Sequence, residues 1–236
     1  GYGAGADALG RVVVVGMTSG VAFPAGRPAR APLHGVDAFA ARVAADGASL
    51  DHVYWFNALT LFAEDEAYAV AVDPAGAAYI TGYTRSADFC TVFGNVPGYQ
   101  PIYQGETDAF VVKIRADGSG LAYCTFIGGS DWDTGRAIAV DKLGNAWVVG
   151  GTWSADFPVT PGAVQPVLAG QRDSFLVKLD AAGSALLYGS YAGGTGQEEA
   201  VGVQISSADS INEHLVYVAG WTNSANFPTT PGVIGP

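Results

Sequence analysis

The sequence predicts an all-β fold made of repeated four-stranded units, and three observations support this prediction. A short apolar run ending in Gly-x-Thr occurs four times, with its glycine at Gly16, Gly82, Gly150 and Gly220. The steps between these glycines are 66, 68 and 70 residues, so the period is nearly constant. No stretch shows the 3.6-residue spacing of apolar side chains that an amphipathic helix requires.

Other positions keep the same register. A phenylalanine follows each glycine by seven residues, at Phe23, Phe89, Phe157 and Phe227. A second apolar run begins with an aspartate in three units, at Asp37, Asp108 and Asp173. These matches define a unit of about 68 residues that occurs three and a half times.

The third unit shows how one repeat divides into strands. Residues 136–141 form a short alternating strand, and a turn containing glycine follows. Residues 146–152, rich in β-branched and aromatic side chains, form the second strand. A long proline-containing loop over 153–172 leads to a third strand at 173–179. Another glycine turn leads to the fourth strand at 185–194.

Four antiparallel strands repeated with this period are typical of the blades of a β-propeller. The predicted blades are 1–63, 64–130 and 131–196, and 197–236 is the first half of a fourth. Because an open arc would leave an unpaired edge, we expect the other blades to come from the same longer polypeptide or from another chain.

The recurring residues receive structural roles. The Gly-x-Thr glycine indicates either close packing of the second strand or a simple bulge, and both interpretations stay open. We expect the recurrent phenylalanine to fill the gap between blades. The residue before it is Asp88, Asp156 or Asn226, which suits a local turn held by that side chain.

Two segments carry a resemblance to a known family. They are "RAIAVDKLGNAWVVGGTWSADFPVTPGAVQP" and "DSFLVKLDAAGSALLYGSYAGG", and they resemble the bacterial β-propeller repeat called the SBBP repeat. The resemblance extends over nearly the whole chain. Unit one lacks the Gly-Gly after its fourth strand, and unit four has an insertion at 206–214. The resemblance implies a ring of about seven blades on a secreted or cell-surface protein, and it implies no reaction.

Composition narrows the function classes. The formal net charge is −11, which argues against nucleic acid and anionic membrane surfaces as partners. Cys90 follows the second strand of its unit and Cys124 lies in the fourth. Strands two and four of a blade lie roughly 9–10 Å apart, and a disulfide needs Cα atoms within about 7 Å. Two separate buried thiols are therefore favoured, and a disulfide requires the loop carrying Cys90 to fold back.

Inter-blade turns and the long loops between strands two and three should emerge on one face. The turns carry acidic residues at equivalent sites near the channel mouth: Glu64, Asp65, Glu66, Asp131, Asp133, Glu198 and Glu199. Such a ring could bind Ca²⁺ or a cationic ligand. The spacing matches no compact calcium loop, so solvated turns without a cofactor are favoured.

The second set of candidates lies in the loop 85–106. It carries Phe93, Tyr99 and Tyr103, and exposed aromatics on an ordered loop suit recognition of a protein or glycan. The alternative is that these loops cap the blade edges.

We predict structural roles for the tryptophans and for the cations that recur on the third strands. We expect the tryptophans to pack between blades, with Met17 and Tyr83 at the positions that Trp153 and Trp221 occupy in their units. The cations that recur on the third strands should form ion pairs at the blade edge; they are Arg42, Lys113 and Lys178.

The resulting prediction is a non-enzymatic extracellular scaffold or adhesion module, and a structural part of a cell-surface assembly is a variant of it. It would bind a protein or glycan through its loop-rich face. The alternative is a glycan hydrolase or lyase with its site at the channel mouth. An enzyme should place buried carboxylates of perturbed pKa in one cleft, whereas a scaffold should expose an apolar patch.

Overall fold

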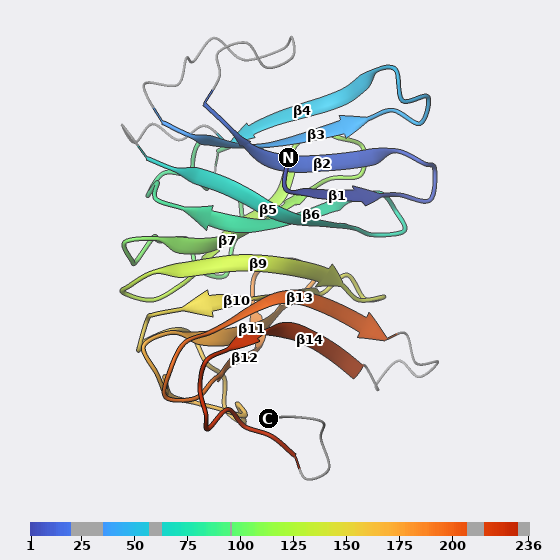
Figure 1. The fold of residues 1–236 in the computed structure, drawn as a ribbon. Coiled ribbons are helices and arrows are strands. Elements are labelled where there is room, and N and C mark those ends of the chain that lie inside the picture. The colour runs from blue at the N-terminus through green and yellow to red at the C-terminus, as the bar shows by residue number, and fades with distance from the viewer. Residues whose placement is uncertain (20–34, 57–62, 95, 207–214, 231–236) are drawn as a thin grey trace.

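The computed structural model describes residues 1–19, 35–56, 63–94, 96–206 and 215–230. These residues form β-strands joined by turns and loops, in three sheets of four strands and one sheet of two. Figure 1 shows the sheets stacked one after another in chain order. The described part of the chain contains no helix long and apolar enough to span a membrane. The predicted all-β propeller architecture is confirmed.

The strands have the following bounds. Blade 1 contains β1 (Gly3–Ala6), β2 (Val12–Thr18), β3 (Asp37–Val43) and β4 (Leu50–Phe56). Blade 2 contains β5 (Asp65–Val72), β6 (Ala78–Thr84), β7 (Asp108–Ile114) and β8 (Leu121–Ile127). Blade 3 contains β9 (Asp133–Val140), β10 (Ala146–Thr152), β11 (Asp173–Leu179) and β12 (Leu186–Ala192). The half blade contains β13 (Glu198–Ser206) and β14 (Leu215–Thr222).

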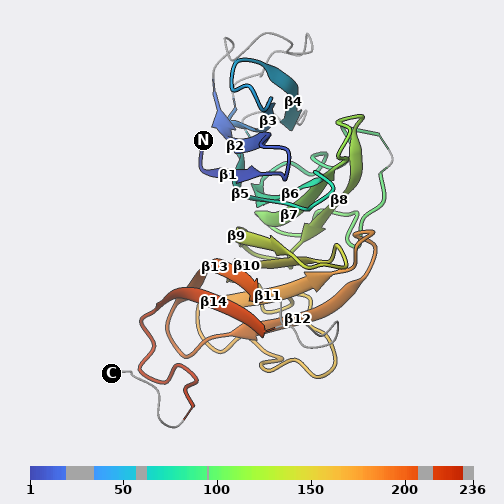
Figure 2. The same ribbon diagram turned by 90° about the vertical axis from the view of Figure 1, so that its right-hand side faces the viewer.

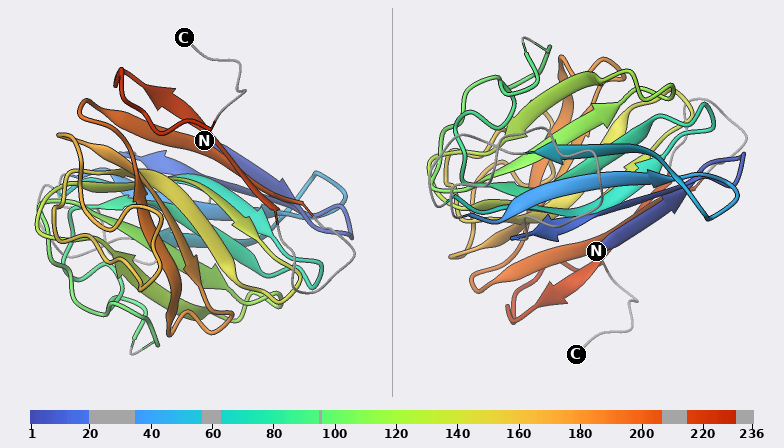
Figure 3. Two further views of the ribbon diagram at one scale, coloured as in Figure 1. Left: turned by 90° about the horizontal axis from the view of Figure 1, so that it is seen from below. Right: turned by 90° about the horizontal axis from the view of Figure 1, so that it is seen from above.

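Within each sheet, strands pair antiparallel in chain order. The first strands of successive blades contact one another, as β1 contacts β5 and β5 contacts β9. Figure 2 shows the first strands along one side of the stack and the fourth strands along the other, and Figure 3 shows the blades fanned about this inner side. Each sheet is therefore one blade, with its first strand innermost.

The predicted bounds for blade 3 differ from the structure at the first and fourth strands, and the fourth strand is Leu186–Ala192 and not 185–194. The second and third strands have the predicted bounds, but β9 begins at Asp133 and not at Arg136. β9 has a bulge opposite Gly150, and beyond this bulge residues 133–135 pair with β10 again. The strand therefore starts three residues earlier than predicted. The atypical segments 57–62 and 207–214 lie outside the described residues.

The hydrophobic core lies between blades. One cluster joins Val15 and Phe56 of blade 1 to Phe89 and Phe110 of blade 2. The ring of Phe89 lies 4.4 Å from that of Phe110 and 5.6 Å from that of Phe56. The expected role of the recurrent phenylalanine is confirmed here, and Phe157 takes the same place in the cluster between blades 2 and 3. Phe23 lies outside the described residues.

The structure supports both interpretations of the Gly-x-Thr glycine, close packing and a bulge, at the same position. A Cβ at Gly82 would overlap the carbonyl oxygen of Glu66, and one at Gly150 would overlap that of Thr134. In each case the first strand bulges opposite the glycine. The bulge pushes the first strand against the second, and only glycine leaves room for it.

The two cysteines form a disulfide, so the favoured expectation of separate thiols is wrong. The Cα atoms of Cys90 and Cys124 lie 5.4 Å apart. The loop after β6 folds back onto β8, where the amides of Cys124 and Phe126 donate to the carbonyls of Pro97 and Gln100. The loop of blade 3 covers β12 in the same way, through Gln165. These loops cap the outer edge of the blade.

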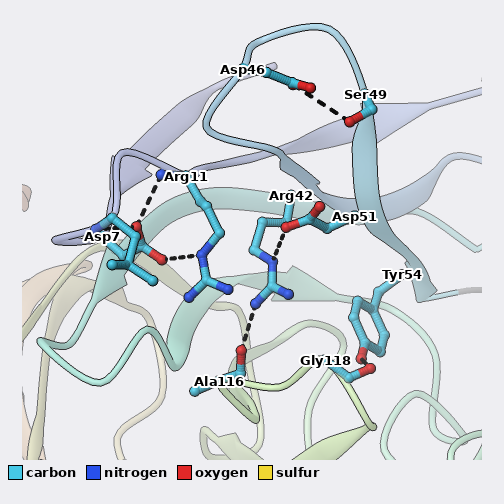
Figure 4. A network of polar contacts seen from close by, with 10 residues as sticks. Asp7, Arg11, Arg42, Asp46, Ser49, Asp51, Tyr54, Ala116 and Gly118 are labelled. Carbon is cyan, nitrogen blue, oxygen red and sulfur yellow. Dashed lines mark hydrogen bonds and ion pairs between the residues drawn. The ribbon is translucent and has the colours of Figure 1, made fainter.

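The cations of the third strands do more than form ion pairs at the blade edge. Arg42 pairs with Asp51 at 3.2 Å, and it also donates to the carbonyl of Ala116 in the next blade (Figure 4). Lys113 forms no salt bridge with the described residues; its Nζ donates to the carbonyl of Ala181 in the next blade. Two successive junctions thus share a hydrogen bond from a third-strand cation to a turn carbonyl.

Candidate functional site

Inter-blade turns and long loops meet on one face of the molecule, as expected. Short parallel bridges join them pairwise, between Val36 and Glu64, Thr107 and Trp132, and Arg172 and Gln197. We call this end of the blades the loop face. The candidate site lies on this face.

Four of the predicted acidic residues are buried, contrary to the expected solvated ring, and three of these four begin a strand. Asp65, Asp133 and Glu198 are the first residues of β5, β9 and β13, and none is more than 2% exposed. Each accepts hydrogen bonds from the hydroxyl group of the Gly-x-Thr threonine, of the serine two residues later, or of both. Sequence reasoning missed this pairing because the partners lie about 20 residues away in the chain.

We call this arrangement the junction clamp. Thr84 and Ser86 donate to Asp65 at 2.5 and 3.0 Å. In blade 3 Ser154 donates to Asp133 at 2.8 Å, and in the half blade Thr222 donates to Glu198 at 2.7 Å. Burial raises the pKa of Asp65 and of Asp133 to about 7, although the hydroxyl donors oppose the shift.

The residue before the recurrent phenylalanine extends the clamp, which corrects the expected local turn. The Asp156 carboxylate accepts from the backbone amide and hydroxyl of Ser130, at 2.8 and 3.0 Å. Asn226 accepts in the same way from Thr195. These side chains hold the turn that enters their own blade. The segment from the Gly-x-Thr motif to the recurrent phenylalanine therefore fixes the inter-blade turn.

The other predicted acids have separate surroundings. Glu64 is exposed and lies 3.4 Å from Arg85, while Glu66 accepts from the hydroxyl of Tyr83 at 3.1 Å. Asp131 is exposed, whereas Glu199 is buried. The described residues contain no group of three or more His, Cys, Asp or Glu side chains that could hold a metal ion.

The predicted aromatic residues of the long loop are half-buried and not exposed. Phe93 packs edge-on against Phe56, and Tyr103 packs edge-on against Phe126. Tyr99 packs against the cluster between blades 2 and 3. The exposure on which their recognition role depended is absent, and this geometry favours the capping alternative.

A cavity of about 250 Å³ opens between blades 2 and 3. Its lining residues are Glu64, Tyr68, Tyr83, Arg85, Thr107, Trp132, Thr134, Arg136, Trp153 and Arg172. We call this cavity the loop-face cleft. Of the predicted site residues, only Glu64 lines it.

Bulges place two of the lining residues that sequence reasoning missed. Tyr68 is the extra residue between Ala67 and Ala69 of β5, and Arg136 is the extra residue of β9. Each stands 14 residues before its Gly-x-Thr glycine. The guanidinium of Arg136 lies 4.5 Å from the ring centre of Tyr68, so the bulged residues of neighbouring blades stack. The fixed offset from the glycine was the available signal.

The tryptophans need a correction of register. The amide of Trp153 donates to Trp132, as that of Arg85 donates to Glu64, so Trp153 is equivalent to Arg85 and not to Tyr83. The position of Tyr83 is taken in blade 3 by Gly151. Trp132 and Trp153 pack edge-on with ring centres 6.3 Å apart, and Trp132 remains 42% exposed. These two indoles form a wall of the cleft.

One comparison with known proteins gives a match. Residues 116–158 match a family described as SBBP, beta-propeller repeat. No curated protein matches the chain. The matched segment begins in the turn between the third and fourth strands of blade 2 and ends after the first two strands and the clamp of blade 3. These elements recur from blade to blade.

Proposed function

We propose that this chain, whose residues 116–158 form an SBBP beta-propeller repeat, is a non-enzymatic extracellular scaffold that binds a glycan through the loop-face cleft. The observation that supports this best is the composition of the cleft wall. Exposed Trp132 lines the cleft together with Tyr68 and Tyr83, and the guanidinium groups of Arg85 and Arg136 lie over the rings of Trp132 and Tyr68. Aromatic faces with a few placed polar groups are typical of small-ligand sites.

The size of the cleft favours a glycan over a protein. Its volume of about 250 Å³ is below the range of about 300–1,000 Å³ usual for drug-sized ligands, so it suits one sugar ring. A protein partner would instead need a broad surface.

The half blade supports a second part of the proposal, which is assembly. Among the described strands β14 pairs with β13 alone, and it exposes Leu215, Tyr217 and Val218. In blade 3 the corresponding strand is covered by β11, and Val148 and Val149 are fully buried. We therefore propose that further blades, from the same longer polypeptide or from another chain, cover this edge.

The disulfide supports the extracellular part of the proposal. Disulfides form and persist mainly outside the reducing cytosol. The Cys90–Cys124 bond fastens an edge-capping loop in one blade only.

The position of the buried acids favours a binding module over the alternative of a hydrolase or lyase. Burial raises the pKa of Asp65, Asp108 and Asp133, as a catalytic acid would need. None of the three lines the cleft. Junction clamps hold Asp65 and Asp133, and backbone amides of its own loop bind Asp108.

A glycan array probed with the labelled chain tests the proposal. We expect binding that Trp132→Ala abolishes and that Leu187→Ala keeps, since Leu187 is exposed on β12, the fourth strand of its blade. Thermal melting of both variants confirms that they fold. Wild-type binding to no glycan, or equal binding by Trp132→Ala, would contradict the proposal.

A further inference from the structure

The lining of the loop-face cleft is richer in cations than the chain as a whole, although Glu106 accepts a hydrogen bond from the lining Trp132 indole at 2.6 Å. The charged lining residues are three arginines and one glutamate, on a chain of formal net charge −11. Positive charge gathered in one cavity of an acidic protein indicates a site for an anion.

Two of the arginines share one carboxylate. Arg136 Nε donates to Glu199 Oε1 at 2.6 Å, and Arg172 Nη2 donates to the same oxygen. Glu199 is only 7% exposed. Two cations facing one anion leave an excess positive charge at the inner end of the cleft.

Arg172 is also incompletely bonded. The residue is 8% exposed, and its Nε has no hydrogen-bond partner among the described residues. A buried donor without a partner is costly, so this guanidinium is short of acceptors. Its Cζ atom lies 4.2 Å from the centre of the Trp153 ring and 5.7 Å from that of Trp221, and these contacts hold it in place.

The room for this guanidinium comes from a sequence difference. Blade 3 has Gly151 where blade 2 has Tyr83 and the half blade has Trp221. A Cβ at position 151 would lie 2.5 Å from Arg172 Nε. Among the described blades, blade 3 alone combines this glycine with an arginine before its third strand, where blades 1 and 2 have Val36 and Thr107, so the cleft is not a repeated feature of the blades.

The third arginine is available to a ligand. The side chain of Arg85 is 38% exposed, and its ion pair with the exposed Glu64 has a length of 3.4 Å. Its guanidinium lies 5.2 Å from the centre of the Trp132 ring. Exposed pairs of this kind contribute little stability, so a ligand carboxylate can replace Glu64 as its partner.

We propose that the loop-face cleft selects an acidic sugar, binding the carboxylate of a hexuronate through Arg85 and the excess charge of Arg136 and Arg172, with the sugar ring against Trp132. This inference rests on the proposed glycan binding. The indoles distinguish it from a site for an inorganic anion, because apolar faces add nothing to the binding of phosphate or sulfate. The fork of a guanidinium matches a carboxylate in two parallel hydrogen bonds.

Calorimetric titration with matched ligands tests the inference. The probes are oligogalacturonate, oligomannuronate and hyaluronan oligosaccharides, each beside its carboxyl-reduced neutral form. We expect at least one acidic form to bind ten times or more tightly than its reduced form. The preference should shrink as salt is raised, because screening weakens exposed charge pairs.

A variant pair locates the selectivity. Arg85→Gln should weaken binding of the acidic form about tenfold and leave the affinity for the reduced form unchanged. Lys142→Gln removes one positive charge at an exposed position in the first turn of blade 3 and should change neither affinity. Equal affinities for acidic and reduced forms, or an unchanged preference in Arg85→Gln, would overturn the inference and leave glycan binding standing. Failure of every sugar here and on the array would overturn both.

Discussion

Arg42 on β3 donates a hydrogen bond of 2.6 Å to the carbonyl oxygen of Ala116, which lies 74 residues further along the chain in the next blade. Lys113 repeats this relationship with Ala181 at 3.2 Å. Because both acceptors lie in the turn between strands three and four, each blade is tied to the next at the end opposite the loop face.

This tie can be tested with two lysines. Lys113 is partly buried, and Lys113→Met keeps its apolar stem but removes the hydrogen bond to the Ala181 carbonyl. We expect a loss of about 1 kcal/mol in the free energy of unfolding, measured by urea denaturation. Lys142→Met, at an exposed position, is the matched control and should change stability much less. Equal losses in the two variants would show that the hydrogen bond adds nothing.

The Gly-x-Thr glycine should tolerate no side chain. Gly150→Ala places a Cβ on the carbonyl oxygen of Thr134, so we expect a loss of about 3 kcal/mol or failure to fold. Gly202→Ala on β13 meets only the Ala219 Cβ at 3.7 Å and should be nearly neutral. Thermal melting compares the two. A Gly150→Ala protein as stable as the control would refute the close approach.

The disulfide should stabilise blade 2 substantially. It closes a loop of 34 residues, for which chain entropy predicts roughly 3–4 kcal/mol. The Cys90→Ser, Cys124→Ser double variant should lose about that much, and its loop over 91–107 should become sensitive to protease. A reducing agent should lower the melting temperature of the wild type alone. An equal response of the double variant would contradict this.

The junction clamps should make the chain more stable in mild acid. Asp133 has a folded pKa of about 7 against an ordinary 3.8, so the folded state binds more protons between these values. Stability contributed by this group therefore falls as pH rises from about 4 to 7 and is constant above that range. Melting temperature measured from pH 4.5 to 8 should show this decline.

A variant assigns the decline to the clamp. Asp133→Asn removes the titrating group and should flatten the profile, although Asp65 and Asp108, whose pKa values burial also raises, keep part of the slope. Asp131→Asn changes an exposed carboxylate of the same turn and should leave the profile as it is. A rise of stability with pH in the wild type would show that the clamp acids are ionised in the folded state.

Strands and tight turns were predictable from the sequence because their determinants are local. Alternation over 173–179 and a glycine of positive φ at Gly144 and Gly183 each act within a few residues. The disulfide was not predictable, because strand spacing alone placed Cys90 too far from Cys124. Only the path of the loop, set by pairing with β8, brings them together.

The cleft was still less accessible to sequence reasoning. Tyr68 and Arg136 face it because a bulge adds one residue to their strands, and a bulge shifts side chains without leaving a local motif. The acidic residues were predicted to be exposed because turns usually expose charge. Three of them are instead buried and accept hydrogen bonds from hydroxyl groups about 20 residues away in the chain.

The contact between Arg42 and Ala116 joins different surfaces of two similar units, and the same is true of Lys113 and Ala181. Such a head-to-tail contact has no internal two-fold axis that could end the series. It repeats with a fixed rotation, and the series closes only when that rotation divides a full circle. The number of blades is therefore a property of the angle set at each junction. A substitution that tilts one junction would change the circumference of the ring, even where every blade folds correctly.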